Sequence, residues 1–196
     1  MYKKQMKLQK VVCFLAIAAA AVMFIYTLGL MTDLYDCLYS TMRNPNDHTK
    51  TSVPGSILYY DMQDFNSVFL KYSIIMIILA VLLFVTNTNI RRRYYVSNYV
   101  ATGLYVVFAV FSCVWAHVNI QMYRSQWLAI DFAALKSHSE IWKSAYTEST
   151  FWFDAHYLVA LLSLVTSGLL VYNLILKINL MKEEKSLIDA GEGAVK

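Results

Sequence analysis

The feature that most constrains this chain is a set of four long segments without a single Asp, Glu, Lys or Arg, at residues 11–32, 72–90, 94–123 and 155–176. A helix that crosses the hydrocarbon core of a bilayer needs roughly 20 mostly apolar residues, because each residue adds about 1.5 Å of rise. Lipid offers the backbone no partner, so such a segment must satisfy its own hydrogen bonds as a helix. The sequence therefore predicts an integral membrane protein with four transmembrane helices.

Composition agrees with this interpretation. Hydrophobic residues make up 58% of the chain and charged residues only 15%, whereas an ordinary soluble domain has about 25% charged residues. We expect an all-α polytopic membrane protein, a single four-helix antiparallel bundle with helical extracytoplasmic extensions. The predicted domain covers residues 1–186, with spans at about 11–32, 70–90, 94–123 and 155–177, outer loops at about 33–69 and 124–154, and a flexible cytoplasmic tail at 187–196.

The basic residues indicate an orientation. Most of the 17 lie in the N-terminal tail, the turn between the second and third spans, and the C-terminal tail, whereas the two long loops are net acidic. The positive-inside rule then places both termini in the cytoplasm, in a plasma or bacterial cytoplasmic membrane. Juxtamembrane basic clusters set topology and contact anionic lipid, so we predict the lipid bilayer as a partner and no nucleic acid.

Helical spacing continues beyond two of the spans. Leu34, Leu38 and Met42 repeat at helical intervals after the first span, until Asn44-Pro45 stops the pattern. Residues 57–70 restart a helix that leads into the second span. The loop at 124–154 contains apolar clusters typical of short amphipathic helices at the membrane interface.

Two histidines are the sharpest candidates for chemistry. His117 and His156 should lie at similar depth near the outer end of the third and fourth spans, each on a helix face with small residues. Small residues let membrane helices approach closely, so we expect both imidazoles to point inward. Such a pair could ligate a b-type haem axially or bind a transition metal. The alternative is that the two rings hydrogen bond each other at the wet edge of the membrane.

Two pairs of aspartates form a second candidate. Asp33 and Asp36 follow the first span, and Asp61 and Asp64 precede the second. Residues three apart share a helix face, so four carboxylates would converge on a divalent cation such as calcium if the two extensions packed together. Repulsion between carboxylates opposes this arrangement, and a solvated acidic face is the alternative.

Aromatic residues favour the predicted outer side of the protein. Tyr and Trp concentrate at both membrane interfaces, but the excess at one side is larger than anchoring requires, which predicts a packed aromatic cap or a binding surface. The residues that we assign to a ligand or partner surface are Trp115, Trp127, Trp142, Trp152 and Tyr157.

The motifs of hydrolases, zinc proteases and nucleotide-binding proteins are missing from this sequence. We therefore expect a non-enzymatic membrane protein, a small accessory or partner-binding subunit that associates with another protein or with its own copies and needs no cofactor. One alternative is a redox subunit linked to quinone, with haem b held by His117 and His156. Another is an accessory component of a transporter or channel.

Overall fold

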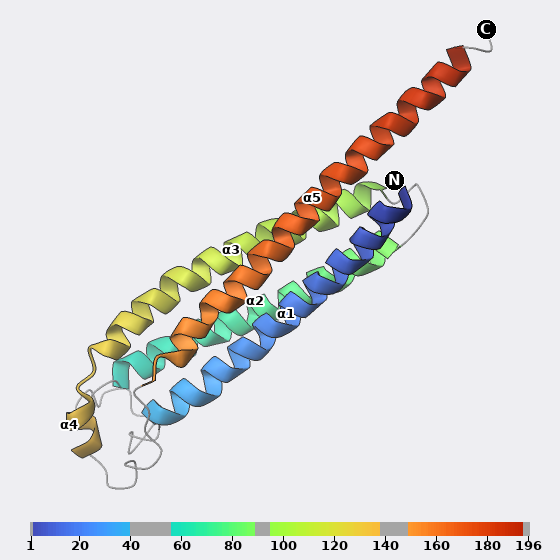
Figure 1. Ribbon diagram of the computed structural model, residues 1–196. Coiled ribbons are helices and arrows are strands. Elements are labelled where there is room, and N and C mark those ends of the chain that lie inside the picture. The colour runs from blue at the N-terminus through green and yellow to red at the C-terminus, as the bar shows by residue number, and fades with distance from the viewer. Residues whose placement is uncertain (1, 40–55, 89–94, 138–148, 194–196) are drawn as a thin grey trace. The chain divides into compact units, whose positions relative to one another are not determined.

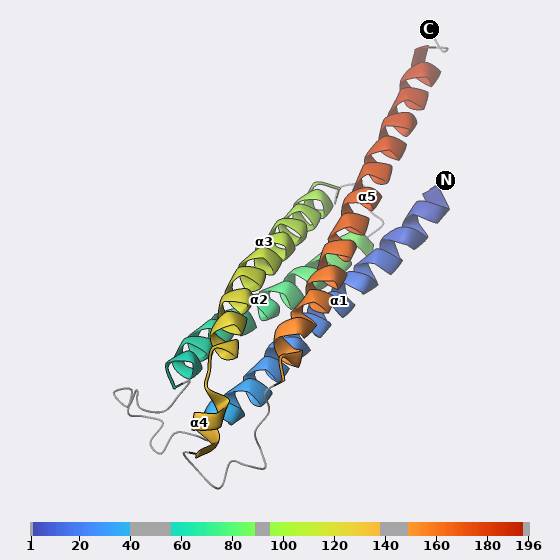
Figure 2. The ribbon, with the colours of Figure 1, turned by 60° about the vertical axis from the view of Figure 1, so that its left-hand side comes forward.

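The computed structural model describes residues 2–39, 56–88, 95–137 and 149–193, and these residues are helical apart from short turns. Figure 1 labels the helices in chain order, and Figure 2 shows the same four long helices unbroken from a second direction. The five helices are α1 (Tyr2–Tyr39), α2 (Ser56–Thr88), α3 (Tyr95–Leu128), α4 (Phe132–Ser137) and α5 (Phe151–Gly193).

Four of these helices are long and apolar enough to cross a membrane. The candidate spans are Lys4–Leu30, Asp61–Asn87, Val96–Leu128 and Phe151–Ile188. The chain contains two prolines, Pro45 and Pro54, and both lie between α1 and α2. The helix interiors therefore keep every backbone donor, as a segment immersed in lipid requires.

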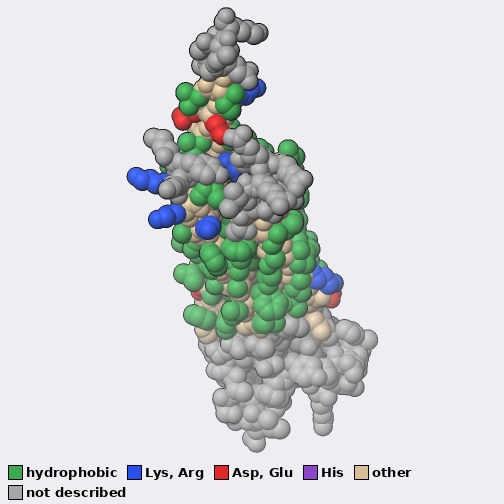
Figure 3. Space-filling model, turned by 90° about the vertical axis from the view of Figure 1, so that its right-hand side faces the viewer, with side chains coloured by type: hydrophobic (Ala, Val, Ile, Leu, Met, Phe, Trp, Pro, Cys, Tyr) green, Lys and Arg blue, Asp and Glu red, His purple; other side chains and the backbone are tan. Residues whose placement is uncertain are grey.

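The described surface is mainly apolar. Large hydrophobic side chains such as Val107, Leu158 and Ile25 are exposed over most of their area, and Figure 3 shows hydrophobic groups covering much of the described surface. Several buried residues are polar, including Thr27 and Ser73. This pattern differs from that of a water-soluble domain, whose surface is more polar and whose buried polar groups are fewer, and it matches a protein whose solvent is hydrocarbon.

The long helices contribute segments to two compact units. Unit 1 comprises Met1–Ala20, Met76–Val110 and Leu162–Lys196, and unit 2 comprises Ala21–Ile75 and Phe111–Leu161. Each unit contains part of α1, α2, α3 and α5, and α4 belongs to unit 2.

The core of unit 1 combines small residues and aliphatic side chains such as Leu83 and Leu170 with one large ring. Ala16, Ala80 and Ala109 are buried, which lets the helix backbones approach closely. Tyr105 of α3 is also fully buried, and its hydroxyl donates to the carbonyl oxygen of Ala16 at 3.2 Å. A buried tyrosine hydroxyl needs such a partner, so this bond attaches α3 to α1.

The core of unit 2 is aromatic. The Tyr26 hydroxyl donates to the Trp152 carbonyl at 2.7 Å and thereby links α1 to the first turn of α5. The Trp152 indole covers Gly29, where even an added methyl group would overlap the ring. Glycine is therefore favoured at residue 29, because a larger side chain would require the indole to shift.

Helix ends differ in places from the sequence-based expectations. At residues 187–193, which belong to the predicted flexible tail, the chain continues α5, which ends at Gly193. Residues 181–190 contain good helix formers and no breaker before Gly191, so propensity extends the helix.

In the predicted second outer loop, α3 continues to Leu128 and α4 forms one short helix. Asp131 caps α4 by accepting from the backbone N–H groups of Ala133 and Ala134, each at 3.0 Å.

Candidate functional site

The two predicted histidines are in contact in unit 2. Nδ1 of His117, on α3, lies 3.0 Å from Nε2 of His156, on α5, and the ring centroids are 5.2 Å apart. His156 is 3% exposed, so it points inward as predicted. His117 is exposed, so the expectation of an inward-facing ring is wrong for this residue.

Hydrogen bonding fixes the roles of the ring nitrogens. Nδ1 of His156 bonds the carbonyl oxygen of Phe153, one turn earlier on α5. Because a carbonyl only accepts, Nδ1 of His156 must carry the proton, which leaves Nε2 as an acceptor in the neutral ring. His117 therefore donates through Nδ1, and a chain of hydrogen bonds runs from the exposed imidazole to the buried backbone carbonyl.

Polar and aromatic side chains surround this pair at the surface. The Tyr157 ring lies 4.0 Å from the His156 ring and 5.7 Å from the His117 ring, measured between centroids. Gln121 Nε2 donates to the Tyr157 hydroxyl at 2.9 Å. Arg124 Nε donates to Asp154 Oδ1 at 3.1 Å. We call this group the α3–α5 surface; it consists of His117, Gln121, Arg124, Asp154 and Tyr157.

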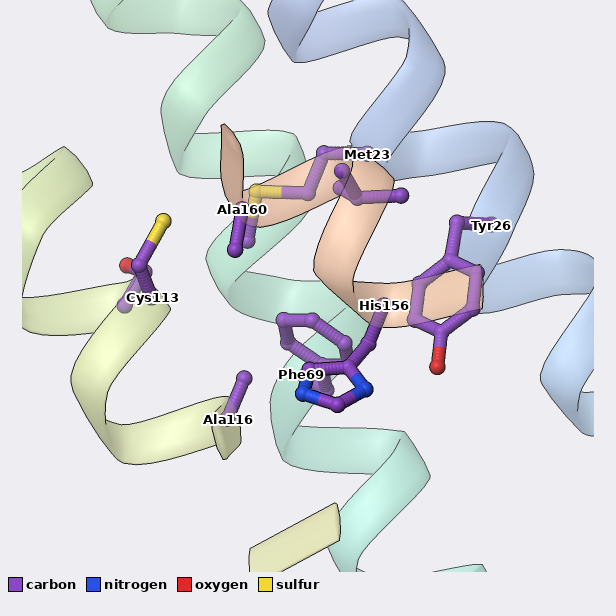
Figure 4. A pocket seen from close by; sticks show the side chains of 9 residues that line it. Met23, Tyr26, Phe69, Cys113, Ala116, His156 and Ala160 are labelled. Carbon is purple, nitrogen blue, oxygen red and sulfur yellow. The ribbon is translucent and has the colours of Figure 1, made fainter. Parts of the chain in front are cut away.

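A small cavity adjoins His156 on the inner side. Figure 4 shows the His156 ring beside Phe69, with Cys113 and Ala116 of α3 on one side and Tyr26 of α1 on the other. The cavity volume is about 10 Å³, which is the lower limit of the space that can hold one water molecule. Its lining includes Ser112, whose buried hydroxyl has no hydrogen-bond partner among the described residues.

The predicted aromatic cap is largely internal. Phe65 of α2 stacks on Trp115 of α3 with centroids 5.0 Å apart, and Phe69 and Tyr72 pack on the same indole at 6.0 and 4.9 Å. Tyr123 extends the cluster at 5.2 Å from Phe65. Aromatic pairs at these distances stabilise beyond their buried area, so the cluster joins α2 firmly to α3.

The tryptophans proposed as a surface occupy different environments. Trp115 and Trp152 are half-buried in aromatic contacts, and Trp127 is 0% exposed, packed on Phe132 and Phe153. Trp127 is thus a core residue in unit 2, and not part of the surface to which we assigned it. Tyr157 is 51% exposed and keeps its surface assignment, while Trp142 lies outside the described residues.

The predicted acidic site is described only in part. Asp61 and Asp64 are exposed on α2, and the side chains of Asp33 and Asp36 lie outside the described set. Within the described residues, no group of three or more His, Cys, Asp and Glu side chains is arranged to hold a metal ion.

Sequence reasoning missed a cluster of buried amides in unit 1. Gln5 Nε2 donates to Gln9 Oε1 at 2.9 Å and to Asn173 Oδ1 at 3.2 Å, and Gln9 Nε2 donates to the carbonyl and side-chain oxygens of Asn87 at 2.6 and 3.0 Å. These bonds join α1 to α2 and α5. The signal in the sequence was the spacing of Gln5 and Gln9, which puts two amides on one helix face.

No protein-family model, curated protein or solved structure matches this chain. Its function must therefore be inferred from the residues themselves.

Proposed function

We propose that this protein is a four-helix antiparallel bundle embedded in a plasma or bacterial cytoplasmic membrane, with both termini in the cytoplasm. The support is the apolar exterior of the four long helices, which also bury polar side chains such as Thr27 and Ser73. In unit 1, Gln9 near the start of α1 bonds Asn87 at the end of α2, and in unit 2, Tyr26 in the second half of α1 bonds Trp152 at the start of α5, as antiparallel neighbours would. Lysines at the start of α1 and the end of α5 support the cytoplasmic assignment.

Extraction and labelling test this placement. The protein should remain in the membrane pellet after carbonate washing and leave it only with detergent. A cysteine introduced by Ser149→Cys should react with an impermeant maleimide from outside intact cells, and one introduced by Lys185→Cys only after permeabilisation, with both tested in a background lacking the native cysteines. Reaction of both cysteines from the same side would overturn the orientation.

We further propose that the protein is a non-enzymatic subunit that binds a partner protein through the α3–α5 surface. The observation that carries this proposal is the preset geometry of that surface. Gln121 and Arg124 are each held by a side chain of α5, beside the exposed Tyr157 ring. Exposed aromatic and Arg side chains are typical of interface centres, and preorganisation lowers the entropy that binding must overcome.

Photo-crosslinking in native membranes tests the partner. A photoreactive benzoylphenylalanine at residue 157 should give a discrete adduct that mass spectrometry identifies. The matched control is the same amino acid at Val107, which is more exposed but has an apolar surrounding and should label lipid. An adduct of twice the chain mass would identify a second copy as the partner. Identical labelling at both residues would contradict the proposal.

A haem b or metal centre at His117 and His156 is a second candidate function. The observation in its favour is that Nε2 of His156 is unprotonated, with Nδ1 anchored on a carbonyl, as histidine ligands generally are. At an N–N distance of 3.0 Å the rings bond each other directly, so haem insertion requires them to separate. A Soret band in protein purified from native membranes, lost in His156→Ala, would support this function, and colourless, metal-free protein would exclude it.

A further inference from the structure

Asn98 and Lys177 form a polar pair between α3 and α5 in unit 1. Lys177 Nζ donates to Asn98 Oδ1 at 3.1 Å. Asn98 is 2% exposed and Lys177 is half-buried. The lysine side chain is thus held between α3 and α5.

Only one of the two polar atoms of the Asn98 side chain has a hydrogen-bond partner among the described residues. Its oxygen accepts from Lys177, but its Nδ2 atom is buried and has no hydrogen-bond partner among the described residues. A buried donor without an acceptor destabilises the folded protein, and each such group in a native protein calls for an explanation. The partner that Asn98 Nδ2 lacks must be a hydrogen-bond acceptor. The neighbouring Lys177 ammonium favours an acceptor that carries negative charge.

The surroundings favour an anion from outside the described chain. The carboxylates among the described residues of unit 1 all lie on α5 at or beyond Glu183, more than one helical turn past Lys177. Exposed lysines on α1, including Lys4, Lys7 and Lys10, add positive charge to the same unit. The local field is therefore positive, and an anion that enters it is stabilised.

The apolar side chains beside the pair indicate what carries this anion. On α5, Leu174, Leu180 and Met181 lie one turn from Lys177 on the same helix face, and all three are half-buried. In addition, Tyr99 donates to Met181 Sδ at 3.0 Å, which joins the two helices next to the pair. A phosphate at the pair would thus have hydrocarbon-compatible surface next to it, as a phospholipid headgroup needs.

We propose that Lys177 and Asn98 form a binding site for a phosphate group, carried either by an anionic phospholipid or by a free phosphate ion. Lysine supplies the charge as a compact donor, and the Asn98 amide supplies a second N–H. The site goes beyond partner binding at the α3–α5 surface, because it lies in the other unit and uses different residues.

Binding to the full-length, delipidated protein tests the site in three arms. Thermal stability in detergent is measured with added phosphatidylglycerol, with sodium phosphate, and with phosphatidylcholine as the zwitterionic control. Native mass spectrometry counts the phosphatidylglycerol molecules that stay bound. Stabilisation by phosphatidylglycerol alone would identify a lipid headgroup, and stabilisation by sodium phosphate as well would identify a site for the free ion.

Two variants and one control connect the binding to these residues. Lys177→Gln removes the charge, and Asn98→Asp replaces the unpartnered donor by an anion while keeping the acceptor for Lys177. Each should weaken binding about tenfold or more, the size expected when a charged hydrogen bond is lost. Lys182→Gln removes the same charge from an exposed residue of α5 and should retain nearly all of the binding.

The outcomes separate a binding site from a structural role. Asn98→Asp keeps a partner for the ammonium, so it should fold, as checked by circular dichroism and gel filtration, even if Lys177→Gln does not. Loss of binding in the folded Asn98→Asp protein supports the site. Unchanged binding in Asn98→Asp, equal loss in Lys182→Gln, or no binding of either anion to the unmodified protein would overturn it.

Discussion

The two units hold their helices together by different chemistry. In unit 1, side-chain amides of Gln5, Gln9, Asn87 and Asn173 bond across three helices. In unit 2, aromatic rings pack on one another, and the Trp115 ring contacts Phe65, Phe69 and Tyr72 of α2. Lipid tails are as apolar as leucine, so packing and polar bonds, and not the hydrophobic effect, determine helix association in a membrane. The two units thus show two ways in which helices can associate in a membrane, through polar bonds and through ring packing.

This difference implies unequal sensitivity to substitution. Removing a large buried ring deletes many contacts at once and leaves a cavity. Removing one amide from this network deletes one to three hydrogen bonds, and such bonds in membrane proteins average about 0.6 kcal/mol each and reach about 1.7 kcal/mol. Unit 2 should therefore respond more strongly to single changes than unit 1.

Trp127→Ala should have the largest effect. Trp127 is completely buried between Phe132 and Phe153, and truncation of a buried aromatic ring costs about 3–5 kcal/mol. SDS titration followed by circular dichroism measures the loss, and hydrogen exchange should locate it in unit 2. The neighbouring Leu128 is exposed, so Leu128→Ala is the control and should change little. Equal effects of the two substitutions would mean that Trp127 is not a core residue.

Gly29→Ala comes next, with a cost of about 1–3 kcal/mol for overpacking. The added methyl group would overlap the Trp152 indole. Gly168→Ala is the matched control, because no atom lies within 4 Å of the methyl group there. A Trp152→Ala change in the same chain should remove most of the penalty of Gly29→Ala, and the double-mutant cycle measures this coupling. Additive effects would show that residues 29 and 152 do not touch.

Gln9→Ala should cost less, about 1–2 kcal/mol, by breaking both bonds to Asn87 and the bond from Gln5, which leaves buried polar atoms without partners. Lys10→Ala alters the next residue, which is exposed, and should be nearly neutral. Hydrogen exchange should increase in unit 1 and remain unchanged in unit 2. A larger effect for Gln9→Ala than for Trp127→Ala would reverse the proposed ranking of the two units.

The sequence predicts most of this fold because the signal is local. Four charge-free segments of helical length identify the four long helices, which the structure confirms as candidate spans. Counting along the helices also placed His117 and His156 at similar depth, and their rings are in contact. Each of these inferences needs only the length of a segment and the rise of a helix.

The remaining features depend on helix rotation and on pairing across long separations. Gln5 and Asn173 are 168 residues apart, and nothing local indicates their contact. Composition placed Trp127 in a surface belt, but the rotation of α3 directs its ring into unit 2. His117 is exposed and His156 is buried, although both share a face with small residues, because only tertiary packing decides which face is covered.

Arg124→Gln should have the smallest effect on stability. The Arg124–Asp154 pair has side-chain exposures of 35% and 46%, and exposed ion pairs contribute about 0–1 kcal/mol. Asp154 also keeps its hydrogen bond from Thr150 at 2.7 Å, so the start of α5 should not unravel. SDS titration should detect a change below about 0.5 kcal/mol, while crosslinking from residue 157 should fall if Arg124 contacts the partner. A large loss of stability would mean that the pair holds α3 to α5, and the α3–α5 surface would then be a structural feature of unit 2.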